Sequence, residues 1–259
     1  MVDLKTRIRA GETLIGVFSD LASPLAVELC GQAGFDWTVL DLEHGAATEA
    51  DLLGLLYAAA ATPMAAIVRP QSAERLRVGR ALDLGAEGVM LPQLKSIDEV
   101  REAVSFLRYP PVGQRGVALR TRGAGMGALG HADVSRVVNE RIVGIVQIEN
   151  GGTVADADAI AALDEVDVLF VGPADLSHSL GIPGRFDEPR FQDSLRTVVD
   201  ACRAHGKAAG ILIYDTAGLP PLVEMGFTFI GLGSEGSFVS SGALAMLAAA
   251  GRAASASSR

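Results

Sequence analysis

The chain has few of the features that mark secreted, membrane or zinc-binding proteins. Its two cysteines, Cys30 and Cys202, stand alone in segments of helical spacing, without a CxxC pair or a nearby histidine. Isolated thiols support neither a disulfide framework nor a zinc site, so we expect buried free cysteines. Apolar runs are too short to cross a bilayer, and the first residues interleave charged and apolar side chains, unlike a signal peptide. The sequence predicts a soluble cytoplasmic protein.

Positive charge is also scarce. The chain has 22 Lys and Arg residues against 31 Asp and Glu residues, which gives a net charge of −9. Nucleic acids and anionic membranes require a basic surface, so neither is expected as a partner. With 49% apolar residues, a chain of 259 residues can bury one large core.

Short, almost continuously apolar segments alternate with longer segments of helical spacing. Such alternation is typical of a parallel sheet with crossover helices. Eight segments in a chain of this length predict a single (β/α)8 TIM barrel over residues 1–259, with a frayed tail at about 252–259. The expected strands are 14–18, 37–42, 65–69, 88–92, 142–149, 166–172, 208–214 and 227–233.

One long irregular insertion, residues 108–134, follows the fourth strand unit. A loop of this length in a compact domain is more often functional than structural. Its small and cationic residues predict a lid over an anion.

Polar residues follow the predicted strands at their carboxyl ends, where the active sites of TIM barrels lie. Their convergence predicts a catalytic corner, because several buried charges are costly without a function. We expect the nearby Glu43 to make only a structural contact, with the backbone of the next loop. The residues at this rim are Asp41, Glu43, His44, Arg69, Gln147, Glu149 and Asp175.

Glu149 and Asp175 supply hard oxygen ligands from adjacent strands, which suits Mg²⁺, Mn²⁺ or Co²⁺ rather than zinc. Such an ion keeps open positions that can chelate an α-keto acid and polarise its carbonyl. Arg69 would bind the carboxylate or enolate oxygen, or it makes only a salt bridge at the strand end. His44 would transfer the proton, with Asp41 fixing its tautomer, unless it is a structural histidine.

Taken together, these motifs resemble the HpcH/HpaI aldolases over nearly the whole chain. The matching segments include "AGFDWTVLDLEHG", "ALDLGAEGVMLPQLKSIDEV", "RYPPVGQRG", "VQIENGGTVADADAIAALDEVDVLFVGPADLSHSLG" and "GFTFIGLGSE". The resemblance implies a class II, metal-dependent aldolase that cleaves a hydroxy-keto acid, such as a 2-keto-3-deoxy sugar acid, into pyruvate or hydroxypyruvate and an aldehyde. The aldehyde remains open between a hydroxy-aldehyde and succinic semialdehyde.

The same resemblance implies residue roles. His44 would be the base, oriented by Asp41, and Arg69 would bind the enolate. Glu149 and Asp175 would hold the metal, with the keto acid bound beside Gln147 and the backbone of Gly172, Pro173 and Ala174. It also implies a homohexamer, a dimer of trimers, with exchanged C-terminal helices.

Asp83 ends the helix before the fourth strand, so it should lie at the opposite rim from His44. The helix dipole disfavours an acid there, which suggests either a special use or a solvated surface charge. The resemblance implies that Asp83 reaches the active site of a neighbouring subunit.

Three other functions remain open. A Schiff-base aldolase needs a lysine in the barrel mouth, and only Lys95 is placed for it, since Lys5 and Lys207 precede strands. "GLGSEGS" after the eighth strand could bind a phosphate, although Glu235 would repel it and favours a plain turn. A non-catalytic barrel that binds a keto acid or phosphate would explain the fold but not the clustered acids beside His44 and Arg69.

Overall fold

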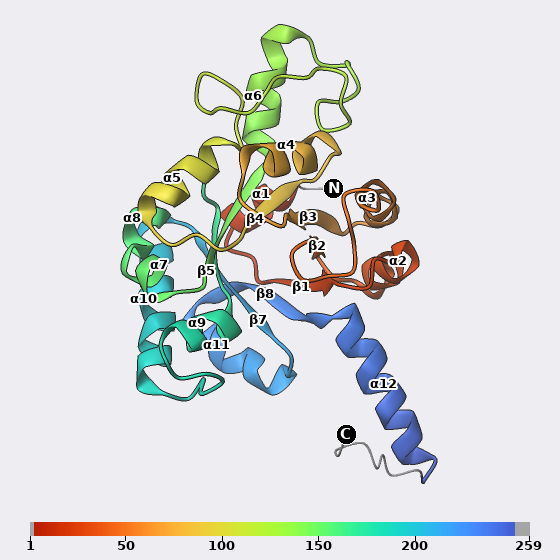
Figure 1. Cartoon of the computed structure of the whole chain (residues 1–259), viewed down its shortest axis with the longest axis vertical. Coiled ribbons are helices and arrows are strands. Elements are labelled where there is room, and N and C mark those ends of the chain that lie inside the picture. Colours follow the sequence, from red (N-terminus) through yellow and green to blue (C-terminus); the bar gives the residue numbers. More distant parts are fainter. Residues whose placement is uncertain (1–2, 252–259) are drawn as a thin grey trace.

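The computed structural model describes residues 3–251 and shows a closed barrel of eight parallel strands (Figure 1). Each strand pairs with its neighbour in sequence, and β8 pairs with β1, which confirms the predicted TIM barrel. The tail expected to fray, 252–259, lies outside the described residues. The strands are β1 (Leu14–Ser19), β2 (Trp37–Asp41), β3 (Ala65–Arg69), β4 (Gly88–Leu91), β5 (Val143–Ile148), β6 (Val168–Val171), β7 (Ala208–Ile213) and β8 (Phe227–Ser234).

Helices surround the barrel, and several begin or end at residues suited to capping. Ser23 and Ser96 accept hydrogen bonds from the first turns of their helices, and the helix before Gly34 ends on a left-handed glycine. The helices are α1 (Leu4–Arg9), α2 (Pro24–Ala33), α3 (Leu52–Ala60), α4 (Arg75–Asp83), α5 (Ile97–Ser105), α6 (His131–Arg141), α7 (Gly151–Ala155), α8 (Ala157–Ala161), α9 (Pro173–Ser179), α10 (Pro189–His205), α11 (Leu219–Met225) and α12 (Glu235–Ala249), with a 3₁₀ turn η1 (Thr216–Gly218).

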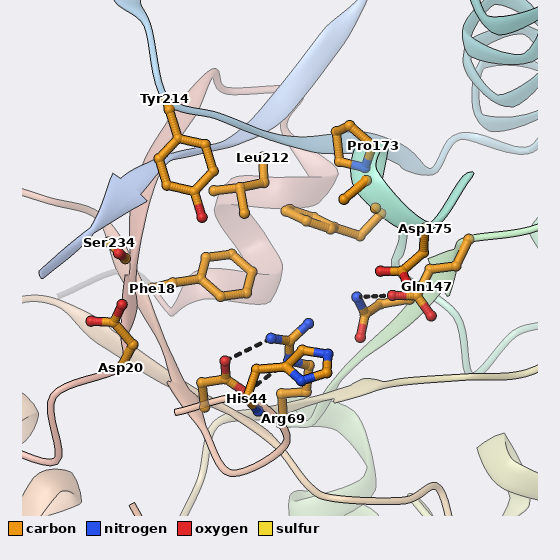
Figure 2. Close-up of a pocket in the computed structure, with 15 residues that line it drawn as sticks. Phe18, Asp20, His44, Arg69, Gln147, Pro173, Asp175, Leu212, Tyr214 and Ser234 are labelled. Carbon is orange, nitrogen blue, oxygen red and sulfur yellow. Dashed lines mark hydrogen bonds and ion pairs between the residues drawn. The ribbon is translucent and has the colours of Figure 1, made fainter. Parts of the chain in front are cut away.

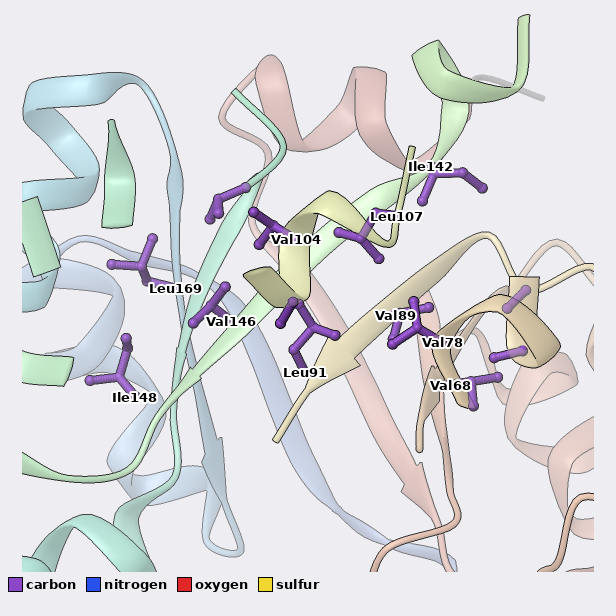
Figure 3. Close-up of a cluster of buried hydrophobic side chains, with 14 of the residues drawn as sticks. Val68, Val78, Val89, Leu91, Val104, Leu107, Ile142, Val146, Ile148 and Leu169 are labelled. Atoms are coloured by element: carbon purple, nitrogen blue, oxygen red, sulfur yellow. The ribbon is translucent and has the colours of Figure 1, made fainter. Parts of the chain in front are cut away.

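Alternate residues of each strand feed two separate apolar cores. One core lies between the sheet and the outer helices, where Val68 and Val89 pack with Val78 of α4 and Leu107 (Figure 3). The other fills the barrel interior and includes Trp37, Val39, Ile67 and Ile145, among others. The period of two along each strand separates these sets, as a sheet buried on both faces requires.

Aromatic packing fills the middle of the barrel interior. The rings of Trp37 and Phe229 stack at 4.2 Å, and Phe170 meets both edge-on. A Cβ atom at Gly16 would come within 2.0 Å of the Trp37 ring, so glycine is required there. The barrel interior is therefore closely packed and closes the bottom of any cavity at the carboxyl rim.

Two expectations are tested directly by the fold. Cys30 and Cys202 are both free and buried, as predicted. The insertion, in contrast, does not form a lid over its own barrel mouth. Gly123 donates to the backbone oxygen of Asp83, and Arg122 donates to that of Leu84, so the insertion packs on the end of α4. The insertion follows α5 and leads through α6 to the amino end of β5, so a lid over the mouth of its own barrel is ruled out.

Within residues 3–251, no helix is both long enough and apolar enough to cross a membrane.

Candidate active site

Side chains that continue the inward-facing parity of the strands form a cavity of about 240 Å³ at the carboxyl rim (Figure 2). On β5, for example, Val143 and Ile145 point into the barrel core, and Gln147 and Glu149 follow at the same period. The lining residues are Phe18, Asp20, Asp41, His44, Arg69, Gln147, Glu149, Phe170, Gly172, Pro173, Ala174, Asp175, Leu212, Tyr214 and Ser234. The cavity thus gathers the residues predicted for the site, except Asp83 and the rim residue Glu43.

Arg69 lies at the centre of one wall and is held on three sides. Its Nε and Nη2 donate to the two carboxylate oxygens of Asp41 at 2.9 and 2.6 Å. Its guanidinium carbon lies 5.2 Å from the Phe18 ring centre, and Glu43 Oε2 lies 3.3 Å from Nε. Burial opposes the charge, but the carboxylates of Asp41 and Glu43 outweigh it and raise the pKa of Arg69. Arg69 is a fixed, permanently charged anchor for an anion.

Glu149 is buried and accepts two hydrogen bonds, from Gln147 Nε2 at 2.6 Å and from the Gln93 backbone N–H at 3.1 Å. Burial, together with the nearby charges of Glu43 and Asp175, raises its pKa to about 7, against the opposing effect of the Gln93 N–H. Buried carboxylates in one another's field are stabilised by a cation among them. The arrangement therefore fits a divalent ion.

The second expected metal ligand, Asp175, comes from the first turn of α9 on the next strand unit. It is exposed and lines the same cavity as Glu149. Residues 3–251 contain no cluster of three or more His, Cys, Asp and Glu side chains arranged for a metal, so the pair of Glu149 and Asp175 would leave several coordination positions open. A Cβ atom at Gly172 would lie 2.9 Å from Glu149 Cγ, which explains the glycine there.

His44 lies at the edge of the cavity with a largely exposed side chain. Asp41 does not contact its ring as predicted: Asp41 Oδ1 accepts the backbone N–H groups of Glu43 and His44, and the carboxylate faces Arg69. The acid nearest the imidazole is Glu43, whose Oε1 lies 3.8 Å from His44 Nε2. Asp41 acts through the backbone because the chain turns immediately after β2.

Glu43 was expected to contact only the backbone of the next loop, and this was wrong. Its side chain is 8% exposed and lies between Arg69 and His44. Burial raises the pKa of Glu43, against the opposing charges of Arg69 and His44. Glu43 lies two residues beyond the end of β2, where the chain turns and its side chain contacts Arg69 and His44 without lining the cavity itself.

Asp83 ends α4, as predicted, and lies outside the cavity of its own barrel. Its Oδ1 accepts a hydrogen bond from Arg115 Nη2 at 2.9 Å. Arg115 is almost fully buried and lies over the ring of Tyr109. The Asp83 side chain is 29% exposed, so one side of it faces outward.

The lysines occupy the expected ends of the barrel. Lys5 donates to Asp167 and to the Ile142 backbone oxygen, and Lys207 donates to backbone oxygens before β6. Lys95 is exposed and lines a neighbouring hollow on the far side of Glu149 and Asp175. It is not among the residues that line the cavity with Arg69.

The "GLGSEGS" segment is neither a plain turn nor a free phosphate loop. It forms the end of β8 and the first turn of α12, with Ser234 as the cap. Glu235 is buried and accepts from Ser19 Oγ at 3.0 Å, and Asp20 accepts from the Gly236 N–H. Two carboxylates already occupy the place where a phosphate would bind.

Several residues in or beside the cavity were not predicted from the sequence, including one acid, Asp20. Phe18 and Asp20 continue the inward parity of β1, and Leu212 and Tyr214 continue that of β7. Gln93 has a left-handed backbone at φ 58° and holds Glu149 through its N–H. The parity of β1 and β7 would have found the first four residues, whereas Gln93 carries no such signal.

A polar cavity at the carboxyl ends of barrel strands has the position of the active site in TIM-barrel enzymes. The chain belongs to the HpcH/HpaI aldolase/citrate lyase family, whose model matches residues 14–241.

Named relatives are similar over most of their length. A 5-keto-4-deoxy-D-glucarate aldolase of Enterobacter sp. (strain 638) is 37% identical over 89% of this chain and 90% of its own. A hydroxypyruvate/pyruvate aldolase of Pseudomonas aeruginosa is 37% identical over 91% and 87%. A crystal structure of a family member from Burkholderia cenocepacia J2315 superposes with a TM-score of 0.90, at 35% identity over 95% and 98% of the two chains.

Citrate synthases also occur among the structural neighbours. One of them has a TM-score of 0.87 at 28% identity, over 97% of this chain and 98% of its own. The family therefore covers more than one reaction.

Proposed function

We propose that this protein is a class II, divalent-metal-dependent aldolase. It would reversibly cleave a 4-hydroxy-2-oxo acid into pyruvate or hydroxypyruvate and an aldehyde. The observation that carries the proposal is the surplus of buried carboxylates around Glu149, beside the fixed cation Arg69. The named aldolase relatives support it.

Glu149 and Asp175 would hold Mg²⁺, Mn²⁺ or Co²⁺. When bound, such an ion polarises the carbonyl of the keto acid. Arg69 binds the carboxylate or the developing enolate oxygen with its planar donor fork. Gln147 Oε1 is buried and accepts no hydrogen bond from the described residues, so it can receive a donor of the substrate. The backbone of Gly172, Pro173 and Ala174 encloses the keto acid.

In cleavage, His44 takes the proton of the 4-hydroxyl group. The C3–C4 bond then breaks, its electrons form the enolate, and the alkoxide becomes the aldehyde carbonyl. In condensation, His44 returns the proton. Glu43 Oε1 lies 3.8 Å from His44 Nε2, close enough to help orient the imidazole ring.

The decisive test removes the metal. Chelation should abolish retro-aldol turnover, and Mg²⁺ or Mn²⁺ should restore it. A Schiff-base enzyme would survive chelation, and a non-catalytic binder would show no turnover at all. Lys95→Met serves as the matched variant: it should retain metal-dependent cleavage, whereas a Schiff-base mechanism through Lys95 predicts its loss.

We further propose that the protein is a homohexamer, a dimer of trimers with exchanged C-terminal helices. Helix α12 contacts the barrel through its first turns and then projects away from it (Figure 1). Its exposed apolar side chains include Val239, Leu244 and Met246. A helix with apolar residues exposed all round requires a partner surface.

In that assembly Asp83 would act in trans, beside His44 of a neighbouring subunit. Complementation tests this. Inactive His44→Ala and weakened Asp83→Ala are purified separately and mixed under conditions that exchange subunits. Mixed assemblies should regain activity above either parent. Mixed oligomers in native mass spectrometry without regained activity would rule out a shared site.

A further inference from the structure

The cavity has two chemically different walls (Figure 2). Gln147, Glu149 and Asp175 form one wall, where the proposed function places the keto acid. Asp20 and Ser234 lie across the cavity from it, and the Tyr214 side chain points inward above Leu212. The wall of Asp20, Tyr214 and Ser234 comes from β1, β7 and β8, and we call it the acceptor wall.

The keto acid occupies only part of the substrate. With the keto acid on the metal side, as the proposed function has it, the fragment that leaves as aldehyde would extend from the reacting carbon toward the acceptor wall. The apolar side chains of Phe18 and Leu212 line the cavity between the walls. The polar groups that the aldehyde meets are thus those of Asp20, Tyr214 and Ser234.

Asp20 is held in place at this wall. Its Oδ1 accepts the Gly236 N–H in the first turn of α12 at 2.8 Å, and its backbone oxygen accepts the Ala46 N–H at 2.9 Å. A Cβ atom at Gly236 would lie 2.9 Å from Asp20 Oδ2, so the close approach depends on glycine. Asp20 is a fixed carboxylate that remains partly open to the cavity.

Tyr214 complements Asp20 as a neutral donor. The Tyr214 residue is largely exposed, and both the partial burial of its phenol and the negative charge of Asp20 raise its pKa. The phenol therefore stays protonated and can donate a hydrogen bond. Ser234 adds a hydroxyl group, which also accepts from the Ser237 N–H.

The charge of the acceptor wall is negative. Asp20 contributes a carboxylate, and the buried carboxylate of Glu235 lies behind it, on Ser19. Arg69 lies on another side of the cavity, where it pairs with Asp41 and, in the proposed function, binds the keto acid. An aldehyde with its own carboxylate would meet like charge here, whereas hydroxyl groups could donate to Asp20 and accept from Tyr214.

We infer that Asp20 is a specificity-determining residue, and that the acceptor wall selects a neutral hydroxyaldehyde over an aldehyde that carries a carboxylate. This inference rests on the proposed aldolase function. It narrows the substrate to a 4-hydroxy-2-oxo acid whose distal end carries hydroxyl groups and no second acid.

The test measures condensation of pyruvate, and of hydroxypyruvate in parallel, with glycolaldehyde and with succinic semialdehyde. The metal-loaded protein should prefer glycolaldehyde in kcat/KM by at least about tenfold, the scale of one like-charge contact near a protein surface. Asp20→Asn keeps an acceptor for the Gly236 N–H and should lower that ratio about tenfold, chiefly by accepting succinic semialdehyde. Asp20→Ser, a smaller neutral residue, should shift the ratio in the same direction.

Asp215→Asn is the matched control. Asp215 is exposed, lies next to Tyr214 and caps η1, so this variant removes one negative charge near the same rim but outside the cavity. It should keep the parent ratio. A parent that prefers succinic semialdehyde, or an Asp20→Asn ratio equal to that of Asp215→Asn, overturns the inference.

Exchange of the pyruvate methyl protons with deuterium tests the aldolase function separately from the role of Asp20, since enolate formation needs no aldehyde. Exchange without the expected aldehyde preference overturns only the role of Asp20. Absence of both exchange and condensation in metal-loaded protein overturns the proposed aldolase function, and the aldehyde preference with it.

Discussion

The two ends of the barrel both bury charged side chains, and they balance that charge differently. At the amino end, Lys5 Nζ donates to Asp167 at 3.0 Å and to the Ile142 backbone oxygen at 2.8 Å. Asp167 also accepts the Gly144 N–H at 2.9 Å, and Arg108 lies 4.0 Å away. The carboxylate at this end therefore has two cations within 4.0 Å of its Oδ2 atom.

At the carboxyl end, the buried carboxylates of Asp41 and Glu43 both contact the guanidinium of Arg69, whereas the third, Glu149, is bonded, among the described residues, only to Gln147 and the Gln93 N–H. Glu149 lies in the field of Glu43 and of Asp175. The oxygen Gln147 Oε1 is buried without a donor among the described residues. This end holds more negative charge than its own side chains compensate.

This difference in charge balance distinguishes a structural cluster at the amino end from a functional site at the carboxyl end. A balanced buried cluster stabilises the native barrel without further ligands, whereas an unbalanced one costs stability until a cation or substrate binds. Such an imbalance persists in a stable protein where the chemistry requires it. The comparison predicts that changes at the mouth alter activity most, and that changes at the amino end alter stability most.

The largest expected effect follows loss of a metal ligand. Glu149→Ala or Asp175→Ala should lower retro-aldol turnover at saturating Mg²⁺ by about a thousandfold or more, because one carboxylate cannot fix the ion and its chelated substrate. Asp193→Ala, at an exposed acid on α10, is the control and should keep parent turnover. Full turnover of either ligand variant would remove that residue from the mechanism.

The next effect distinguishes the group that transfers the proton from the group that binds the anion. His44→Ala should lose about 10²- to 10⁴-fold in kcat while keto-acid binding changes little. Arg69→Ala should weaken both keto-acid binding and turnover, since Arg69 carries the anion contact. Steady-state kinetics and calorimetric titration with pyruvate measure the two quantities. An Arg69→Ala protein with unchanged affinity and rate would contradict the assignment.

At the amino end we expect a loss of stability instead. Lys5→Met leaves Asp167 buried without its nearest cation and should lower the free energy of unfolding by about 3–5 kcal/mol. Arg7→Met is the control on the same helix: its ion pairs with Glu12 and Asp36 are partly exposed, and their loss should cost about 0.2–1 kcal/mol. Urea unfolding measures both. Equal losses in the two variants would show that the buried cluster has no special role.

Much of the barrel and of its mouth could be predicted because both follow strand parity. The alternation that separates Val143 and Ile145 from the outer core also brings Gln147 and Glu149 into the cavity. The contact of Asp83 with Arg115 could not be predicted, because it depends on the path of an irregular insertion. The orientation of Asp41 escaped for a related reason: the chain leaves β2 there, and parity ends with the strand.

The smallest expected effect is a change in the stability of metal-free protein on Glu149→Gln, which measures the cost of unbalanced charge at the barrel mouth. Glutamine can keep both hydrogen bonds, because the Gln147 amide can turn so that its free oxygen faces the new NH₂ group. Only the negative charge is lost.

The pH dependence of this effect has a definite sign. The pKa of Glu149 rises from 4.5 to about 7 in the folded protein. A raised pKa means that the folded state holds the proton more tightly, so this contribution is complete below pH 4.5 and is lost as pH rises through 7. Metal-free parent protein should therefore lose stability over this interval relative to Glu149→Gln, by on the order of 3 kcal/mol. Chemical unfolding at several pH values measures the difference, and Mg²⁺ should reverse it at pH 8 by stabilising only the parent. A difference that stays constant between pH 5 and pH 8 would show that the mouth carries no uncompensated charge at Glu149.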